Sequence, residues 1–283
     1  MIGPPWQPRR AVRWTGSRWS PSSETPAALP PTLRVLTWNV LWDKYNPEAL
    51  ASHQRWPRLL DAALATRADL IALQEVTRAV HDLVLDHPAV RAGWWVSHPR
   101  GHSDIGPYDL LWLGRKPTLS LGFLPLEARK GALAVALPGL ILCTTHLSSD
   151  HRTGAPRRRQ AELDRIGAAL SPPFAIVGDL NCETVQLPGS VDAWTSVHAT
   201  PPEPTFDPTL NPLATHASRT GRPRHIDRML LHGPRAVSAH RIGTTPIDGV
   251  WPSDHAGVVF QLQPPPTPAA HPHPSERPPP SRR

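Results

Sequence analysis

Cysteine is scarce in this chain of 283 residues, which contains only two. Two cysteines cannot form the disulfide framework of a small secreted domain, and Cys143 lies inside the apolar run "LILCTTHL", so we expect a reducing compartment. Long apolar runs are also missing. No stretch reaches the about 18 residues of a membrane span, and no run of about 7–15 apolar residues follows the N-terminal arginines as in a signal peptide. These absences predict a cytoplasmic protein without a membrane partner.

Lysine occurs only at positions 44, 116 and 130, so arginine supplies 27 of the 30 basic side chains. Arginine suits bidentate contacts with phosphate, but richness in Arg, Ala and Pro is also typical of a GC-rich genome. Of the net charge of +7, residues 1–32 carry +3 and residues 264–283 carry +2, which leaves +2 for the residues between them. Such a mildly basic core neither requires nor excludes a polyanionic partner.

Proline is abundant, and its 37 residues crowd both ends of the chain. Segments such as "QPPPTPAAHPHPSERPPPSRR" bury too little apolar surface to offset the entropy lost on ordering. We therefore predict a disordered Pro/Arg-rich segment over residues 1–32 and a disordered Pro-rich tail over residues 264–283. Residues 33–263 are then expected to form one globular domain.

Short apolar runs separated by turn signals predict more strands than helices. Helical spacing predicts helices over 53–67 and 157–170. Strands are expected at 33–40, 68–76, 108–115, 131–147 (broken by the turn "PG" at 138–139), 174–178, 225–232 and 255–262. No internal repeat is present. This profile is typical of an α+β fold or a layered α/β sandwich.

Polar side chains stand at the ends of many of these strands. In "FAIVGDLNCE", Asp179 and Asn181 are two positions apart and so face the same side of a strand. The others are Asn39, Gln74, Glu75, His146, Asp227, Asp254 and His255. Each one taken alone has an ordinary structural interpretation, such as a turn aspartate or a core histidine. Because burying so many unpaired carboxylates is costly, we expect the groups to converge and share a partner.

The residue types in this set indicate a chemistry. Oxygen ligands from Glu, Asp and Asn, with no Cys cluster and no HExxH motif, favour a hard cation such as Mg²⁺ or Mn²⁺. Histidines among carboxylates suit acid–base work or contact with phosphate. A metal and an imidazolium together neutralise the charge on the pentavalent transition state of a phosphate ester, while a carboxylate orients and deprotonates the attacking water. The set therefore favours metal-dependent hydrolysis of such an ester.

Five short motifs follow one another along the chain: "LTWNV", "LIALQEV", "GDLN", "HIDRML" and "SDH". In this order and at this length they resemble the endonuclease/exonuclease/phosphatase (DNase I-like) superfamily, over essentially residues 33–263. The resemblance implies an α/β fold, a four-layer sandwich of two mixed β-sheets flanked by helices, with the site at one rim. It also implies a metal-dependent hydrolase that uses Mg²⁺ or Mn²⁺.

Roles for individual residues follow from the same resemblance. Glu75 is implied as the main metal ligand, helped by Asn39, with Asp254 on the metal side. Arg115 in "WLGRKP" and Tyr108 match weaker substrate-contacting positions of some members.

The resemblance also implies a catalytic set. Asp179 resembles the residue that activates water, and Asn181 the one that stabilises the developing phosphorane. His255 resembles the histidine that contacts the scissile phosphate, and Asp227 the residue that orients it. His146, in "TTHL", matches a second histidine of several branches.

Within the superfamily, the chain looks most similar to the tyrosyl-DNA phosphodiesterase branch. The segments "LPGSVDAWTSV" (187–197) and "PTFDPTLNPLA" (204–214), and "THLSS" followed by "RRRQAEL", carry this likeness. Phe206 stands where the eukaryotic enzymes have tryptophan, at a substrate-binding position. The branch implies a monomeric phosphodiesterase acting at nucleic-acid ends, with 5′-tyrosyl-DNA adducts or repair ends of DNA or RNA as substrates.

Two other functions stay open from the sequence. The first is the same hydrolysis acting on a small phosphorylated molecule or a lipid head group instead of nucleic acid. The net charge of the core does not decide between these substrates. A binding domain without catalysis is the alternative of another class. Such a domain would be expected to have lost a carboxylate or a histidine, whereas Glu75, Asp179, Asp227 and His255 are all present.

Overall fold

The computed structural model describes most of the chain, namely residues 2–22, 28–43, 46–99, 109–116, 118–127 and 130–265. The described strands form two β-sheets, one of eight strands and one of seven. Each sheet is mixed. Strands β4 (Leu33–Asn39) and β5 (Leu70–Val76) pair in parallel in the first, and β10 (Leu140–His146) and β11 (Phe174–Asp179) pair in parallel in the second.

The sheets are built from strands far apart in the chain. The order of the larger sheet is β14 (Arg235–Ile242), β15 (Gly257–Gln263), β4, β5, β7 (Asp109–Gly114), β6 (Trp95–Val96), β2 (Val12–Trp14) and β3 (Trp19–Pro21). The order of the smaller is β1 (Gln7–Arg9), β8 (Ser120–Pro125), β9 (Gly131–Leu137), β10, β11, β13 (Asp227–His232) and β12 (Val191–Asp192).

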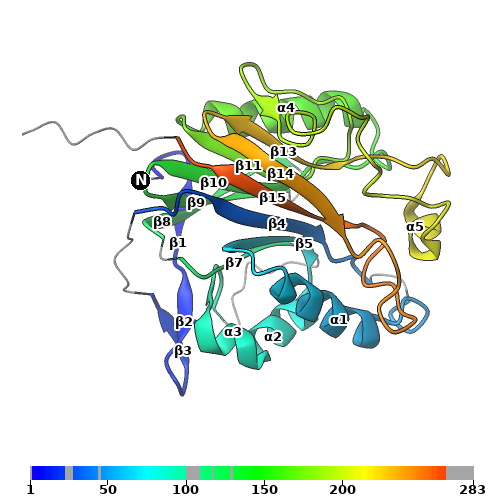
Figure 1. Ribbon diagram of the computed structural model, residues 1–283, viewed down its shortest axis with the longest axis horizontal. Coiled ribbons are helices and arrows are strands. Elements are labelled where there is room, and N and C mark those ends of the chain that lie inside the picture. The colour runs from blue at the N-terminus through cyan, green and yellow to red at the C-terminus, as the bar shows by residue number, and fades with distance from the viewer. Residues whose placement is uncertain are drawn as a thin grey trace, which may run out of the picture.

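Helices cover the outer faces of both sheets (Figure 1). The described helices are α1 (Ser52–Ala65), α2 (Arg78–Asp86), α3 (Pro88–Gly93), α4 (Ala155–Ala168) and α5 (Pro212–Ala217). Helices α1, α2 and α3 pack on the eight-stranded sheet and α4 packs on the other, which makes the four layers expected from the sequence. None of these helices is long and apolar enough to cross a bilayer, since α1 and α4, the longest, have 14 residues each.

Alternation along the strands divides the apolar residues between two cores. In β4, Leu33 and Val35 face the other sheet, while Leu36 and Trp38 face the helices. The inner core between the sheets therefore collects every second residue of the central strands. Each fully buried aliphatic or aromatic side chain there contributes roughly 1.5–3 kcal/mol by leaving water.

The inner layer becomes polar toward one end. Gln74 of β5 donates from Nε2 to Thr37 Oγ1 of β4 and to Thr144 Oγ1 of β10, both at 3.0 Å. All three side chains are fully buried, and the second bond crosses from one sheet to the other. This cross-sheet link fixes how the two sheets meet directly below the rim where the central strands end.

Most elements expected from the periodicity are confirmed, including the turn at 138–139 between β9 and β10. Outside the N-terminal segment, the sequence prediction missed β6, β8, β12, β14, α2, α3 and α5. Strand β14 is an edge strand in which few residues are buried, so it lacks the apolar alternation on which the prediction relied. Helix α2 did carry a start signal, because Thr77 caps it by accepting a hydrogen bond from the Val80 amide.

The N-terminal segment corrects the sequence prediction. Disorder over residues 1–32 is wrong for the part that forms β1, β2 and β3, which extend both sheets. Trp6 is only 6% exposed in the core beneath α4, and its Nε1 donates to Ala169 O at 2.8 Å. The prediction of disorder rested on the high Pro and Arg content of the segment and gave no weight to its few apolar residues, such as Trp6 and Val12, that are buried in the cores. Nearly all of the predicted C-terminal tail, residues 266–283, lies outside the described residues.

Replacing the Trp6 anchor tests this correction. We expect Trp6→Ala to lower the free energy of unfolding by about 3 kcal/mol, because it empties a buried site and removes the indole hydrogen bond. Chemical denaturation of the full chain measures the change, with exposed Gln7→Ala as control. A loss below about 0.5 kcal/mol, the range of surface substitutions, would show that the segment does not contribute to the fold.

Candidate active site

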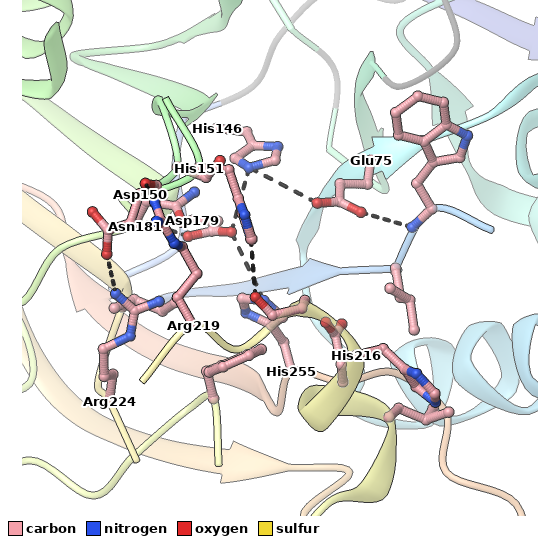
Figure 2. Close-up of a pocket in the computed structure, with 18 of the residues that line it drawn as sticks. Glu75, His146, Asp150, His151, Asp179, Asn181, His216, Arg219, Arg224 and His255 are labelled. Carbon is pink, nitrogen blue, oxygen red and sulfur yellow. Dashed lines mark hydrogen bonds and ion pairs between the residues drawn. The ribbon is translucent and has the colours of Figure 1, made fainter. Parts of the chain in front are cut away.

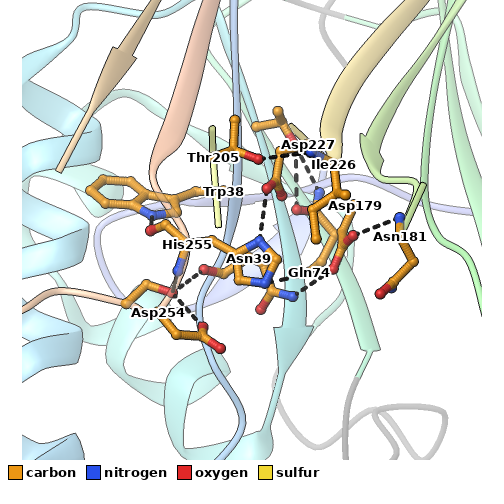
Figure 3. A network of polar contacts seen from close by, with 12 residues as sticks. Trp38, Asn39, Gln74, Asp179, Asn181, Thr205, Ile226, Asp227, Asp254 and His255 are labelled. Atoms are coloured by element: carbon orange, nitrogen blue, oxygen red, sulfur yellow. Dashed lines mark hydrogen bonds and ion pairs between the residues drawn. The ribbon is translucent and has the colours of Figure 1, made fainter. Parts of the chain in front are cut away.

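Polar side chains from both sheets meet at one rim of the sandwich (Figures 2 and 3). Strands β4, β5, β10 and β11 end at this rim, and β13 and β15 begin there because they run antiparallel to their neighbours. The residues that the sequence placed at strand ends therefore converge: Asn39, Glu75, His146, Asp179, Asn181, Asp227, Asp254 and His255. They surround or underlie a cleft of about 400 Å³.

Local backbone irregularity aims Glu75 into the cleft. Leu73, two residues earlier on β5, points to the helix-covered face, and regular alternation would send Glu75 the same way. Instead the pairing of β5 with β7 shifts register between Leu73 and Val76, and Glu75 has φ +61°. A bulge of this kind re-aims a side chain, and a positive φ away from glycine is retained where the surroundings require it.

Asn39 links carboxylates of the two sheets. Its Nδ2 donates to Glu75 Oε1 and to Asp179 Oδ2, both at 3.1 Å (Figure 3 shows the second bond). The second oxygen of Glu75 accepts from the Trp42 amide at 2.7 Å. The Glu75 side chain nevertheless stays 20% exposed toward the cleft, so it is held in place without being sealed off.

Asp179 is the most deeply buried carboxylate facing the cleft. Burial raises its pKa to about 7, although the nearby His255 and the bonds from Asn181 and Asn39 favour the charged form. Its Oδ1 accepts from the Asn181 amide at 2.9 Å. A carboxylate with this pKa can take a proton near neutral pH, which an ordinary exposed aspartate does poorly.

His255 and Asp227 form a buried pair. The distance from His255 Nδ1 to Asp227 Oδ2 is 2.7 Å, and Nε2 lies 3.9 Å from Asp179 Oδ2. Burial opposes the charge of the imidazole, but Asp227, Asp254 and Asp179 together raise the pKa of His255 well above its ordinary value. These three carboxylates therefore favour the protonated, imidazolium form of His255.

Neighbouring groups fix the position of this pair. Thr205 Oγ1 accepts from the amides of Ile226 and Asp227, both at 3.0 Å, and so sets the start of β13. Trp38 Nε1 donates to His255 O at 2.9 Å, and the Phe206 ring lies 5.1 Å from the His255 ring. Phe206 thus lines the cleft, as expected for a substrate-contacting residue.

His146 is electrostatically different from His255. Its Nε2 lies 3.5 Å from Asp179 Oδ2 and 3.9 Å from Glu75 Oε1. Burial, together with the positive charges of Lys130 and His255, places the pKa of His146 well below its ordinary value. The surroundings therefore favour the neutral form of His146 and the charged form of His255. Asn181 stands beside them with Nδ2 donating to Leu147 O at 3.1 Å.

A model of the Endonuclease/Exonuclease/phosphatase family matches residues 36–255, which include every residue of this polar group. The chain belongs to this family. No curated protein sequence matches the chain.

Solved structures of the family share the fold. The structure of D. rerio TDP2 complexed with single strand DNA product has a TM-score of 0.67 at 19% identity, over 82% of this chain and 99% of that one. The human nocturnin catalytic domain with bound sulfate anion has a TM-score of 0.60 at 21% identity, over 83% and 96%. An endonuclease/exonuclease/phosphatase from Bacteroides vulgatus has a TM-score of 0.61 at 15% identity, over 82% and 98%. TDP2 is thus among the similar folds, as the resemblance to the tyrosyl-DNA phosphodiesterase branch implied.

The residues at the Glu75 end of the cleft suit a divalent cation, as is typical of the family. Burial raises the pKa of Asp254 to about 6, and the negative charge of Glu75 adds to the increase. A hard cation between these two carboxylates would relieve their repulsion and match their oxygen donors. Asp179, Asp227 and His255 also place ligand atoms within 4.8 Å of one another. There, however, His255 Nδ1 is hydrogen-bonded to Asp227 Oδ2, and the surrounding carboxylates favour the protonated imidazole, a form that must lose its proton before it can bind a metal.

Two weaker sequence predictions fare differently. The structure does not bring Arg115, predicted to contact substrate, to the cleft. Strand β7 runs antiparallel to β5, so its first residue lies at the rim and Arg115 follows the opposite end, where its guanidinium lies 4.7 Å from the Trp94 ring. Tyr108 lies outside the described residues.

Lys130 is a site residue that the sequence prediction missed. It lines the cleft, is 7% exposed, and donates from Nζ to Leu147 O at 3.2 Å. Burial lowers its pKa to about 8, although the charges of Asp179 and Glu75 oppose the change. The available signal was its rarity, since Lys130 is one of three lysines and directly precedes the apolar strand "GALAVAL".

The Asp227–His255 pair gives a pH prediction. In protein without added metal, Asp227→Asn is expected to lower the pKa of His255, because the carboxylate that favours the imidazolium becomes a neutral amide. Nitrogen-15 NMR titration of the histidine side chains measures this pKa. The exposed Asp164→Asn serves as control and should leave it unchanged. An unchanged His255 pKa in Asp227→Asn would show that the pair is not the source of the shift.

Proposed function

We propose that this chain is a divalent-metal-dependent phosphodiesterase that hydrolyses phosphodiester bonds at nucleic-acid ends, including 5′-tyrosyl-DNA adducts and repair ends of DNA or RNA. The observation that carries the proposal is the convergence of Glu75, Asp179 and the Asp227–His255 pair on one cleft. Hydrolysis of a phosphate diester requires a cation site, a base for water and positive charge for the phosphoryl oxygens, and this group supplies all three.

The metal-holding end is assigned to Glu75 and Asp254, with Asn39 keeping Glu75 in place through its amide. When bound, Mg²⁺ or Mn²⁺ supplies positive charge that polarises a phosphoryl oxygen. Arg55 supports this end from below. It is fully buried and donates to the carbonyl oxygens of Val40 and Leu41. These bonds fix the loop after β4, whose Trp42 amide donates to Glu75.

Asp179 is assigned to the water. With a pKa near 7 it can take the proton of a water molecule as the water oxygen bonds to phosphorus and the bond from phosphorus to the leaving oxygen breaks. A tyrosine leaving group has a pKa of about 10, so its phenolate departs without a strong acid beside it.

The remaining polar groups are assigned to the phosphate. The His255 imidazolium donates from Nε2 to a non-bridging oxygen, while its Nδ1 stays on Asp227. Asn181 uses one N–H for Leu147 O and has a second for a phosphoryl oxygen. His146, neutral and between Glu75 and Asp179, can accept or relay a proton.

Nucleic acid as the substrate class is supported by comparison. D. rerio TDP2, which shares the fold, has been solved with a single strand DNA product. The sequence resemblance to that branch points the same way. We propose that the protein acts as a monomer on a strand end that enters the cleft.

A small phosphorylated molecule is the second candidate. The cleft volume of about 400 Å³ falls in the range of small-molecule sites, roughly 300–1,000 Å³. The nocturnin catalytic domain, also similar in fold, was solved with a sulfate anion. The chemistry assigned to the cleft is the same for both substrate classes.

Asp179→Asn tests the proposal. On a 5′-phosphotyrosyl oligonucleotide with Mg²⁺ or Mn²⁺, we expect tyrosine release to fall by about a hundredfold or more, because the amide cannot take the water proton. The control Asp164→Asn should keep wild-type activity.

An abasic duplex and a single-stranded RNA are assayed in parallel. Cleavage of one of these instead would keep the phosphodiesterase chemistry and change the substrate. If neither wild type nor variant hydrolyses any of the three substrates or simple phosphodiesters, the proposal is contradicted and a binding domain without catalysis is favoured.

A further inference from the structure

Two arginines line the side of the cleft that lies away from Glu75. Arg219 and Arg224 belong to the segment between α5 and β13, and Figure 2 shows both beside Asp150. The roles assigned above use neither of them. We call this pair the arginine wall.

The arginine wall is held by Asp150 and carries surplus positive charge. Asp150 Oδ2 lies 2.7 Å from Arg224 Nη1, its Oδ1 lies 2.6 Å from Arg159 Nη1, and its backbone oxygen accepts from Arg219 Nη1. Buried Arg159 alone would balance the one carboxylate. The charges of Arg219 and Arg224 are then uncompensated among these contacts, and both residues reach the cleft.

The carboxylates are unevenly distributed along the cleft. Of the four carboxylates that line it, Glu75, Asp179 and Asp254 belong to the catalytic end, and only Asp150 lies at the arginine wall. The exposed Arg152 also lines the cleft and lowers the pKa of Lys130 by its charge. A ligand that spans the cleft would therefore contact the metal-binding end of the cleft with one part and the arginine wall with another.

Phe206 connects the wall to the catalytic end. Its ring lies 5.1 Å from the His255 ring, and the Arg224 guanidinium carbon lies 5.7 Å from its centroid. Arg224 is therefore one aromatic ring away from the group assigned to the scissile phosphate. The Arg224 side chain keeps 24% of its surface exposed while Asp150 fixes its direction. Such a guanidinium is preorganised for a bidentate phosphate contact.

We propose that the cleft takes a substrate with two phosphate groups, and that the arginine wall binds the one that does not react. This inference rests on the proposed function, because it takes the other phosphate to be the scissile one beside Asp179 and His255. The second phosphate is either the next one along a nucleic-acid strand or a terminal phosphate of a small molecule. Arg219 and Arg224 are the residues that would select for it.

A matched pair of chromogenic substrates tests the inference. Thymidine 5′-(p-nitrophenyl phosphate) has one phosphate, and its 3′-phosphorylated form differs only by the second. We expect wild type to favour the second compound by about tenfold or more in kcat/KM, since charge-assisted hydrogen bonds are strong. In an Arg219→Ala, Arg224→Gln double variant the preference is expected to fall to about one. The exposed Arg157→Gln, outside the cleft, should keep it.

A third substrate separates the two sources of the second phosphate. In the p-nitrophenyl ester of the dinucleotide pTpT the second phosphate is a diester, as in a strand. Preference for this compound as well indicates a nucleic-acid strand. Preference for the terminal monoester alone indicates a small phosphorylated molecule. Equal rates on all three compounds in wild type would overturn the inference.

Binding keeps the inference testable if the chain does not turn over these compounds. Calorimetry compares thymidine 3′,5′-bisphosphate with thymidine 5′-monophosphate in wild type and in the double variant, whose fold is checked by circular dichroism. A preference of about tenfold for the bisphosphate that the variant loses would support the second site, even if the proposed activity failed. No preference in wild type would overturn the second site while leaving any measured hydrolysis in place.

Discussion

The carboxamide of Asn39 holds together two carboxylates that belong to different sheets. One NH₂ group gives one hydrogen bond to Glu75 and one to Asp179, so two negative charges are fixed close together with a shared donor between them. The remaining oxygen of Asn39 accepts from the Leu41 amide, which sets the orientation of the carboxamide. The separation between the cation end and the water-activating end of the cleft depends on this arrangement. The buried Gln74 joins the same two sheets through its hydrogen bond to Thr144.

Burying this many ionisable groups costs free energy unless their charges are balanced. The structure balances them locally, with the imidazolium of His255 on Asp227 and buried cations at Arg55 and Lys130. The balance is incomplete, since the pKa values of Asp179 and Asp254 stay raised, at about 7 and about 6. Carboxylates that resist ionisation in the free protein are what a divalent cation would stabilise. The raised pKa values of these two carboxyl groups thus agree with the cation site proposed at the Glu75 end.

The sequence predicted those features that follow a period or a motif. Apolar runs placed the central strands and both long helices. The polar groups beside these runs share one rim because the parallel pairs β4–β5 and β10–β11 end there and the antiparallel strands β13 and β15 begin there. What it could not predict depends on tertiary contacts. The bulge that turns Glu75 inward cannot be recognised in "LIALQEV". The docking of Trp6 depends on β8, with which the following strand β1 pairs, and on Ala169 O after α4, both more than a hundred residues away in the chain. Arg115 was misplaced because position in the chain does not tell which end of an antiparallel strand faces the site.

The location of the metal is the measurement that tests this account most directly. A crystal grown with Mn²⁺ and measured by anomalous scattering shows where the ion binds. We predict an anomalous peak near a Glu75 carboxylate oxygen, with Asp254 on the same side, at about the 2.0–2.6 Å of oxygen ligation by hard cations. A peak only between Asp179, Asp227 and His255 would contradict it, because the imidazolium would then have to lose its proton to become a ligand.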